Sequence, residues 1–229
     1  MTALRLADDE RGRSAAIGAL QAGGVVGLPT DTVYGIAVAL STPNGVERLF
    51  AAKSRPPDKA ISVLVDGLDQ VEVLVRIPRA AAILGQVGWP GGLTLVLPLK
   101  PAVAGAFLPL ALTAGTETLG VRIPAHPCPR ALARALGPLP TTSANRSGEP
   151  AALEADSVEA ALGGALDVIL DGGRTRGNVP STVVDCASED GLARILRVGA
   201  VAPVALAAAL DRARIAHAIA VDADTDGAT

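Results

Sequence analysis

Short apolar runs alternate along this chain with stretches of helical periodicity, and this alternation limits the possible folds more than any other feature. It predicts a layered α/β domain built on a mixed sheet. Strands are predicted over residues 25–28, 61–65, 93–97, 119–123, 139–142, 168–170, 182–185 and 194–198. Helices are predicted over residues 13–22, from Thr42-Pro43 to Phe50, in two stretches within 69–87, and over 129–136, 157–162 and 203–214.

The composition excludes several classes of protein. With 229 residues, 49% of them hydrophobic, and a net charge of −3, the chain can bury a core, so disorder over most of its length is excluded. Cys128 and Cys186 are too few for a disulfide framework and form no CxxC motif, and two histidines cannot make a His-rich metal site. Aromatic residues make up only 2%, which disfavours a platform that stacks nucleic-acid bases. A pI of 5.4 argues against a uniformly basic surface but leaves room for a basic cleft.

The two ends of the chain predict location and domain boundaries. The N-terminus lacks the apolar stretch of a signal peptide, and no apolar run is long enough to span a membrane. We therefore expect a cytoplasmic protein with no membrane partner. The last residues are small and acidic, which predicts one domain over residues 1–215 and a disordered tail over 216–229.

Polar side chains cluster where three of the predicted strands begin or end. The clusters are Thr-Asp-Thr at 30–32, Thr-Thr-Ser-Ala-Asn at 141–145 and Ser-Thr at 181–182. Ligands of open α/β sheets bind beyond strand ends, so three such clusters predict one shared cleft. The alternative is that each cluster is a turn or a helix cap, for which these residue types are also favoured.

Cations occupy two kinds of position. Two of the three lysines of the chain, Lys53 and Lys59, flank Arg55 in a segment stiffened by two prolines, which suits the oxygens of a polyphosphate. A basic helix C-terminus explains the same residues equally well. Arg122 and Arg197 lie inside apolar strands, where each must either point to solvent or reach a carboxylate or phosphate. Motifs of P-loops, dinucleotide sites, serine hydrolases and zinc proteases are absent, and Cys128, Cys186, His126 and the single Trp are predicted to be structural.

Seven segments in order resemble the YrdC-like family of threonylcarbamoyl-AMP synthases. They span roughly residues 13–200, and they read GGVVGLPTDTVYGIAV (23–38), KSRPPDKAISVLV (53–65), WPGGLTLVLP (89–98), GVRIPAHP (120–127), TTSANRSGEP (141–150), STVVD (181–185) and ILRVGA (195–200). The resemblance implies a three-layer, YrdC/RibB-like fold with a twisted, mixed, mostly parallel sheet. It implies a short form, without the further C-terminal domain of longer relatives.

The resemblance also implies an activity. The family is a nucleotidyltransferase, an L-threonylcarbamoyladenylate synthase that uses L-threonine, bicarbonate and ATP with Mg²⁺ and releases pyrophosphate. Its product supplies the threonylcarbamoyl modification of tRNAs that read codons beginning with A, through a tRNA threonylcarbamoyl-transfer complex. Binding of tRNA or double-stranded RNA in the basic cleft is a further expectation.

Site residues follow by motif position. The resemblance implies that threonine is bound by Thr32, Arg122, Ser143 and Ser181, and that ATP is bound by Lys53, Arg55, Lys59, Thr118, Asn145 and Arg197, with Lys53 and Arg55 as the catalytic pair. No protein metal site is expected. Cations, hydroxyls and an amide suit adenylate formation, which needs positioning and charge neutralisation rather than a protein nucleophile.

The chain departs from the family pattern at four positions. Leu64 stands where a threonine-contacting histidine is common, Lys59 where asparagine is common, Leu153 where a hydroxyl residue is common, and Val198 where the family has proline. Two alternatives therefore stay open. One is a YrdC-like paralogue that binds nucleotide or RNA without synthase activity. The other is an enzyme that handles a different carbamoyl-adenylate, like the related domain of hydrogenase-maturation carbamoyltransferases.

Overall fold

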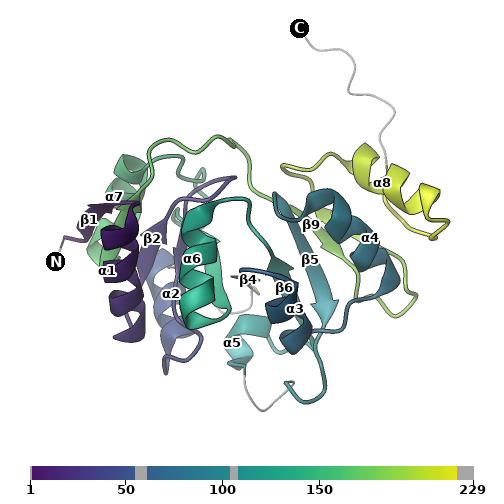
Figure 1. Cartoon of the computed structure of the whole chain (residues 1–229), viewed down its shortest axis with the longest axis horizontal. Coiled ribbons are helices and arrows are strands. Elements are labelled where there is room, and N and C mark those ends of the chain that lie inside the picture. Colours follow the sequence, from purple (N-terminus) through teal and green to yellow (C-terminus); the bar gives the residue numbers. More distant parts are fainter. Residues whose placement is uncertain (1, 55–60, 104–107, 221–229) are drawn as a thin grey trace, which may run out of the picture.

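Ten strands form one mixed sheet in a computed structural model that describes residues 2–54, 61–103 and 108–220 (Figure 1). Across the sheet the strands follow the order β1-β8-β2-β3-β7-β4-β6-β5-β9-β10. Their bounds are β1 (Leu4–Ala7), β2 (Val26–Leu28), β3 (Gly35–Ala37), β4 (Ser62–Leu64), β5 (Leu93–Pro98), β6 (Thr118–Arg122), β7 (Leu139–Ser143), β8 (Val168–Asp171), β9 (Thr182–Asp185) and β10 (Arg194–Arg197).

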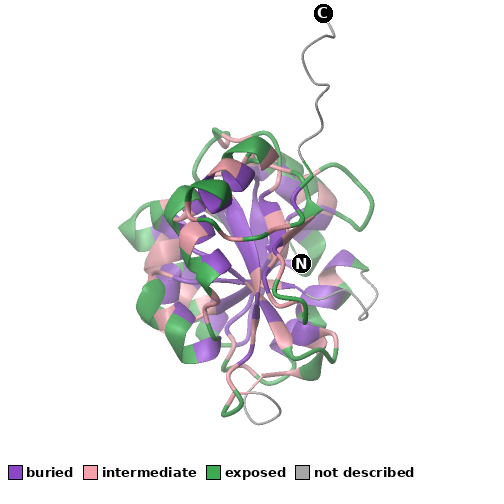
Figure 2. Ribbon diagram, turned by 90° about the vertical axis from the view of Figure 1, so that its right-hand side faces the viewer, coloured by how far each residue is buried: buried purple, intermediate pink, exposed green. Residues whose placement is uncertain are grey.

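Helices lie on both faces of this sheet, as the layered prediction requires (Figure 2). α1 and α6 pack on one face, and the larger apolar cluster joins the other face to the remaining α-helices. The bounds are α1 (Glu10–Gln21), α2 (Gly45–Lys53), α3 (Leu68–Leu74), α4 (Arg79–Gly88), α5 (Leu110–Thr113), α6 (Pro127–Leu136), α7 (Ala155–Leu162), a 3-10 turn (Gly163–Ala165) and α8 (Pro203–Arg212).

The sheet is mixed, but it is not mostly parallel. Among the described strands, the pairs β1–β8, β2–β8, β4–β6 and β5–β9 are parallel, whereas β2–β3, β3–β7, β4–β7, β5–β6 and β9–β10 are antiparallel. Only residues 29–34 separate β2 from β3, which is room for a reversal but not for a crossover helix. β7 then lies between β3 and β4 and runs antiparallel to both.

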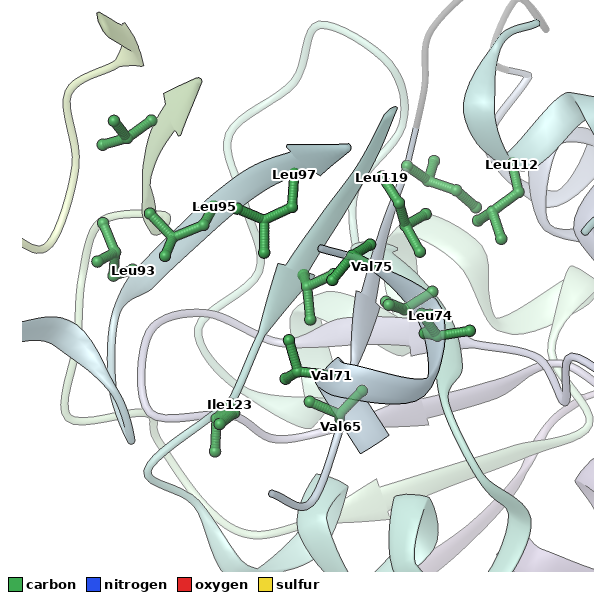
Figure 3. Close-up of a cluster of buried hydrophobic side chains, with 14 of the residues drawn as sticks. Val65, Val71, Leu74, Val75, Leu93, Leu95, Leu97, Leu112, Leu119 and Ile123 are labelled. Atoms are coloured by element: carbon green, nitrogen blue, oxygen red, sulfur yellow. The ribbon is translucent and has the colours of Figure 1, made fainter. Parts of the chain in front are cut away.

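Successive side chains of the central strands point to opposite faces of the sheet, so one set enters the core and the other faces the cavity. Leu93, Leu95 and Leu97 of β5 are fully buried against the cluster that includes Val71 and Leu74 of α3 (Figure 3). Each such side chain stabilises the fold by about 1.5–3 kcal/mol. A slip of one residue would turn these leucines to the opposite face, so the core fixes which side chains of β5 point away from it.

Four elements were not predicted: β1, β3, α5 and the 3-10 turn. β1 is an edge strand whose Leu4 is 57% exposed. Because such a strand is not buried on both faces, its sequence has no continuous apolar run. β3 is Gly-Ile-Ala, too short and too small to produce a pattern. The predicted start of α2 was also wrong, because Asn44, with φ of 57°, precedes the helix, while the Thr42 hydroxyl donates to the Leu20 carbonyl at 3.3 Å.

The packed part of the chain continues past residue 215. The backbone N–H of Ala218 donates to the Ala193 carbonyl at 3.0 Å, and Ile219 is buried. This corrects the predicted boundary, because residues 216–220 belong to the domain. The rest of the predicted tail, 221–229, lies outside the described residues. Within the described part, no helix has the length and apolar character needed to cross a bilayer.

The residues predicted to be structural lie in the scaffold. Cys128 and Cys186 are buried, and burial raises the pKa of both thiols, that of Cys186 to about 12. The His126 Nδ1 accepts from the Cys128 N–H at 3.2 Å and so caps α6. The Trp89 indole donates to the Leu93 carbonyl at 2.7 Å, which ties α4 to β5.

Candidate functional site

A cavity of about 240 Å³ opens on the sheet face that α6 covers in part. Leu64 of β4 and Leu139 of β7 are paired in register, so their side chains share a face; Leu139 packs with α6, and Leu64 lines the cavity. Thr94 and Arg122 line it as well, because alternation turns their neighbours into the opposite core. The same strands therefore supply both: alternate side chains on one face enter the apolar core, and those between them, on the other face, line the cavity.

The three polar clusters converge, as predicted. Residues from 30–32, 141–143 and 181 all line this one cavity. Six of the ten predicted site residues also line it: Thr32, Thr118, Arg122, Ser143, Ser181 and Arg197. Lys53 and Asn145 reach it through contacts with Ser143. Arg55 and Lys59 lie outside the described residues, so their predicted positions stay predictions.

Arg122 is a buried cation of the site, held by three hydrogen bonds. Its side chain is 7% exposed, and its Nε donates to the Gly91 carbonyl at 2.9 Å. Nη1 donates to the Thr32 hydroxyl at 2.9 Å, and Nη2 donates to the Asp31 carboxylate at 2.7 Å. Burial lowers the pKa of Arg122, and the nearby charge of Arg197 lowers it too, whereas Asp31 raises it. The sequence argument that an arginine in an apolar strand needs a partner is confirmed, and the partner is Asp31.

Arg197 lines the cavity from β10, an edge strand of the sheet. Its Nε and Nη2 donate to the Ser181 carbonyl at 3.1 and 2.8 Å, and Nη2 also donates to the Ser181 hydroxyl at 3.2 Å. Burial lowers its pKa. No carboxylate pairs with it among the residues that the structure describes. A partly desolvated guanidinium that has no counter-charge among the described residues favours an anionic ligand.

Lys53 lies at the end of α2 with its ammonium against β7. It is 2% exposed, and its Nζ donates to the Ser143 carbonyl, to the Ser143 hydroxyl at 3.3 Å and to the Asn145 side-chain oxygen at 3.2 Å. The Ser143 hydroxyl in turn donates to Asn145 Oδ1 at 2.5 Å. Lys53 therefore holds the 143–145 cluster in place, a role that the spacing of lysines in the sequence did not indicate.

Two cavity residues, Thr94 and Thr30, were not assigned to the site by the sequence analysis. The Thr94 and Ser181 hydroxyls are 2.8 Å apart, and the Thr30 hydroxyl donates to the Val33 carbonyl at 2.6 Å. Thr94 is the only polar residue in the run Leu-Thr-Leu-Val-Leu, and that isolated hydroxyl was the available signal. Thr30 belonged to a recognised cluster but was given no role.

The segment from Gly172 to Ser181 brings the last cluster to the site. It leads from β8, second in the sheet order, to β9, ninth in that order (Figure 1). The Tyr34 hydroxyl donates to the Gly173 carbonyl at 2.8 Å and accepts from the Gly172 N–H at 3.1 Å, and burial raises its pKa to about 12. Gly177 lies so close to Thr32 that a Cβ would be 2.7 Å from the Thr32 Cα. These contacts fix the position of Ser181, the residue before β9.

The chemistry available in this cavity is binding and charge neutralisation. Its lining holds two guanidinium groups and several hydroxyls, and none of the described lining residues is a Cys, His, Asp or Glu. The described residues contain no group of three or more His, Cys, Asp or Glu placed to hold a metal ion. Such a site can bind an anionic substrate and stabilise charge on transferred groups.

Comparison with known proteins supplies the family. The Sua5/YciO/YrdC family model, described as "Telomere recombination", matches residues 18–199. The chain belongs to this family. A Pyrococcus abyssi relative named threonylcarbamoyl-AMP synthase is 40% identical over 172 residues, 74% of this chain and 49% of that protein. A Xanthomonas campestris pv. campestris relative of the same name is 38% identical over 164 residues, 69% of this chain and 84% of that protein.

A solved structure of this family confirms the fold. The crystal structure of P. abyssi Sua5 complexed with L-threonine matches with a TM-score of 0.82 and 33% identity, over 99% of this chain and 65% of that one. The resemblance to YrdC-like proteins is thus confirmed in both sequence and fold. The chain spans about half the length of the P. abyssi curated relative. The activity of the whole relative is therefore only proposed for this chain.

Proposed function

We propose that this family member is an L-threonylcarbamoyladenylate synthase, a nucleotidyltransferase that makes threonylcarbamoyl-AMP and pyrophosphate from L-threonine, bicarbonate and ATP. One observation carries the proposal: the guanidiniums of Arg122 and Arg197 face a single hydroxyl-lined cavity, and desolvation lowers the pKa of both. Two such cations suit a substrate pair with two anionic parts. The names of the relatives and the L-threonine complex of P. abyssi Sua5 support the choice of substrate.

The two guanidiniums divide the substrates in this proposal. Arg122 and Thr32 receive the carboxylate of threonine, with Ser143 and Ser181 near its amine and hydroxyl. Arg197, which lacks a carboxylate partner among the described residues, receives phosphate oxygens. Thr118 and Asn145 support the nucleotide, and Lys53 acts mainly by holding Ser143 and Asn145. Arg55 and Lys59 are proposed as further phosphate contacts on sequence grounds alone.

The reaction needs no covalent protein intermediate. The threonine amine adds to the carbon of bicarbonate, and loss of water gives a carbamate. A carbamate oxygen then attacks the α-phosphorus of ATP, the α–β phosphoanhydride bond breaks, and pyrophosphate leaves with the electron pair. Holding the carbamate and the α-phosphate in line, and neutralising the leaving charge, supplies the acceleration.

Mg²⁺ bound with ATP is the proposed cofactor, and the cavity is compatible with it. Mg²⁺ is usually held by substrate phosphates, waters and one or two protein oxygens, and the cavity offers hydroxyl oxygens. When bound, the ion would neutralise phosphate charge. No residue of this chain is assigned to it as a ligand.

The product has to be consumed by an acyl transfer to tRNA, so we include a tRNA threonylcarbamoyl-transfer complex as the downstream partner and the cytoplasm as the location. Binding of tRNA or double-stranded RNA by the cleft itself is a weaker part of the proposal. It rests on the two guanidiniums only.

The test is a pyrophosphate assay with omission of each substrate. The protein is incubated with ATP, Mg²⁺, bicarbonate and L-threonine, and release should require all of them. Arg197→Ala should raise the KM for ATP at least tenfold, because a charged contact to phosphate is lost (~1.5–3 kcal/mol). Arg194→Ala is the matched control, since Arg194 lies on the same strand but is paired with Asp190 and does not line the cavity.

Three results would reject the proposal. Pyrophosphate release without dependence on threonine would indicate another acceptor. ATP binding without turnover would favour the non-catalytic paralogue. Turnover that needs a carbamoyl donor other than bicarbonate would favour a different carbamoyl-adenylate enzyme.

A further inference from the structure

Asp31 forms the only ion pair that the described residues give to Arg122. Its Oδ1 accepts from Nη2 at 2.7 Å, and the side chain is 18% exposed. Asp31 itself does not line the cavity, although Thr30 and Thr32 on either side of it do. The carboxylate therefore contacts Arg122 from outside the cavity.

The bonds of Arg122 leave part of its guanidinium available. An arginine side chain has five N–H groups. Three are taken by Gly91, Thr32 and Asp31, one on each nitrogen. One N–H on each terminal nitrogen thus has no partner among the described residues. Two such N–H groups can bind a carboxylate from the cavity side.

The backbone around Asp31 is fixed. Thr32 is tied to Thr30 through its N–H at 3.1 Å, and a Cβ on Gly177 would lie 2.7 Å from the Asp31 carbonyl oxygen. The ion pair of Asp31 with Arg122, at 2.7 Å, therefore ties the guanidinium to a fixed stretch of backbone. Asp31 is therefore placed to decide which N–H groups face the cavity.

We propose that Asp31 is a positioning residue for amino-acid binding: it holds Arg122 so that two N–H groups meet the carboxylate of the amino-acid substrate. The proposal rests on the proposed function for the identity of that carboxylate. It assigns Asp31 no contact with substrate. It predicts an effect on the amino-acid step and none on the nucleotide step.

Steady-state kinetics provide the first test. At saturating ATP and bicarbonate, Asp31→Ala should raise the KM for L-threonine about tenfold or more, with a smaller change in kcat and less than about a twofold change in the KM for ATP. Asp31→Asn keeps an acceptor oxygen at the same place, and its KM for threonine should stay within about threefold of wild type. This rescue separates positioning from general damage.

Asp66→Ala is the matched control. Asp66 also pairs with arginines, Arg130 and Arg134, and its side chain is 19% exposed, but neither of these arginines lines the cavity as Arg122 does. It should lose stability like Asp31→Ala and keep a wild-type KM for threonine. A comparable rise in that KM for Asp66→Ala would overturn the proposal.

A spectroscopic test does not depend on turnover. The Nε–H resonance of Arg122, assigned by its loss in Arg122→Lys, should be sharp and slow to exchange in wild type and in Asp31→Asn. It should broaden or disappear in folded Asp31→Ala. An unchanged resonance in Asp31→Ala would overturn the proposal even if the protein had no synthase activity. If the resonance responds as expected but threonine supports no turnover, the proposed function fails and the positioning of Arg122 stands.

Discussion

Two cations of the cavity lie in different surroundings: Arg122 is buried, whereas Arg197 is exposed. At β6 the protein surrounds Arg122 with a carboxylate, a hydroxyl and a carbonyl. At β10 the hydrogen bonds that Arg197 makes within the described residues go to the carbonyl and hydroxyl of Ser181. A cation paired with a carboxylate of the protein can stabilise the fold without any ligand. A cation without such a carboxylate is stabilised in part by the ligand that it binds. The difference separates a structural cation from a ligand-dependent one.

The largest expected change in the free energy of unfolding comes from breaking the Arg122–Asp31 ion pair. Arg122→Ala leaves Asp31 without its partner, and the free energy of unfolding should fall by about 3 kcal/mol. Adding Asp31→Ala should cost less than the sum of the single changes, because the double variant has no unpaired charge. Urea unfolding of the four proteins measures this coupling. Additive changes would mean that the pair does not stabilise the fold.

A substitution of Lys53 tests whether a third cation stabilises the fold, as Arg122 is expected to do. Its ammonium is held by Ser143 and Asn145, so Lys53→Met should lower the free energy of unfolding by about 2 kcal/mol in addition to reducing turnover. Lys100→Met provides the control, with an expected change below about 0.5 kcal/mol. A Lys53→Met protein that is inactive but as stable as wild type would instead place Lys53 with the ligand-dependent cations.

Arg197 should give the smallest change in stability. Arg197→Ala is expected to alter the free energy of unfolding by less than about 1 kcal/mol, because it leaves no carboxylate of the described residues without a partner. The ligand response should change instead. Pyrophosphate should raise the melting temperature of wild type and fail to raise that of Arg197→Ala, since a ligand stabilises only the state that it binds. A destabilisation equal to that of Arg122→Ala would remove the contrast between the two cations.

Much of the site could be predicted because its residues stand out locally. A polar cluster at the end of a short apolar strand, or an arginine within one, is visible without any contact information. The residues that were missed are visible only through their partners. Asp31 lay in a recognised cluster, yet nothing local indicated that it pairs with an arginine 91 positions later. Thr94 became a site residue because β9 brings Ser181 beside it.

The sequence by itself determined the layered α/β class, the order of most elements and the family, because these depend on periodicity and on motifs read within a few residues. Only the tertiary structure decided the sheet order and the nearly equal mixture of parallel and antiparallel pairs. It also decided that one guanidinium pairs with a carboxylate while the other has no carboxylate partner within residues 2–54, 61–103 and 108–220. These depend on contacts between residues far apart in the chain. No local pattern records which distant carboxylate or carbonyl a buried cation will meet.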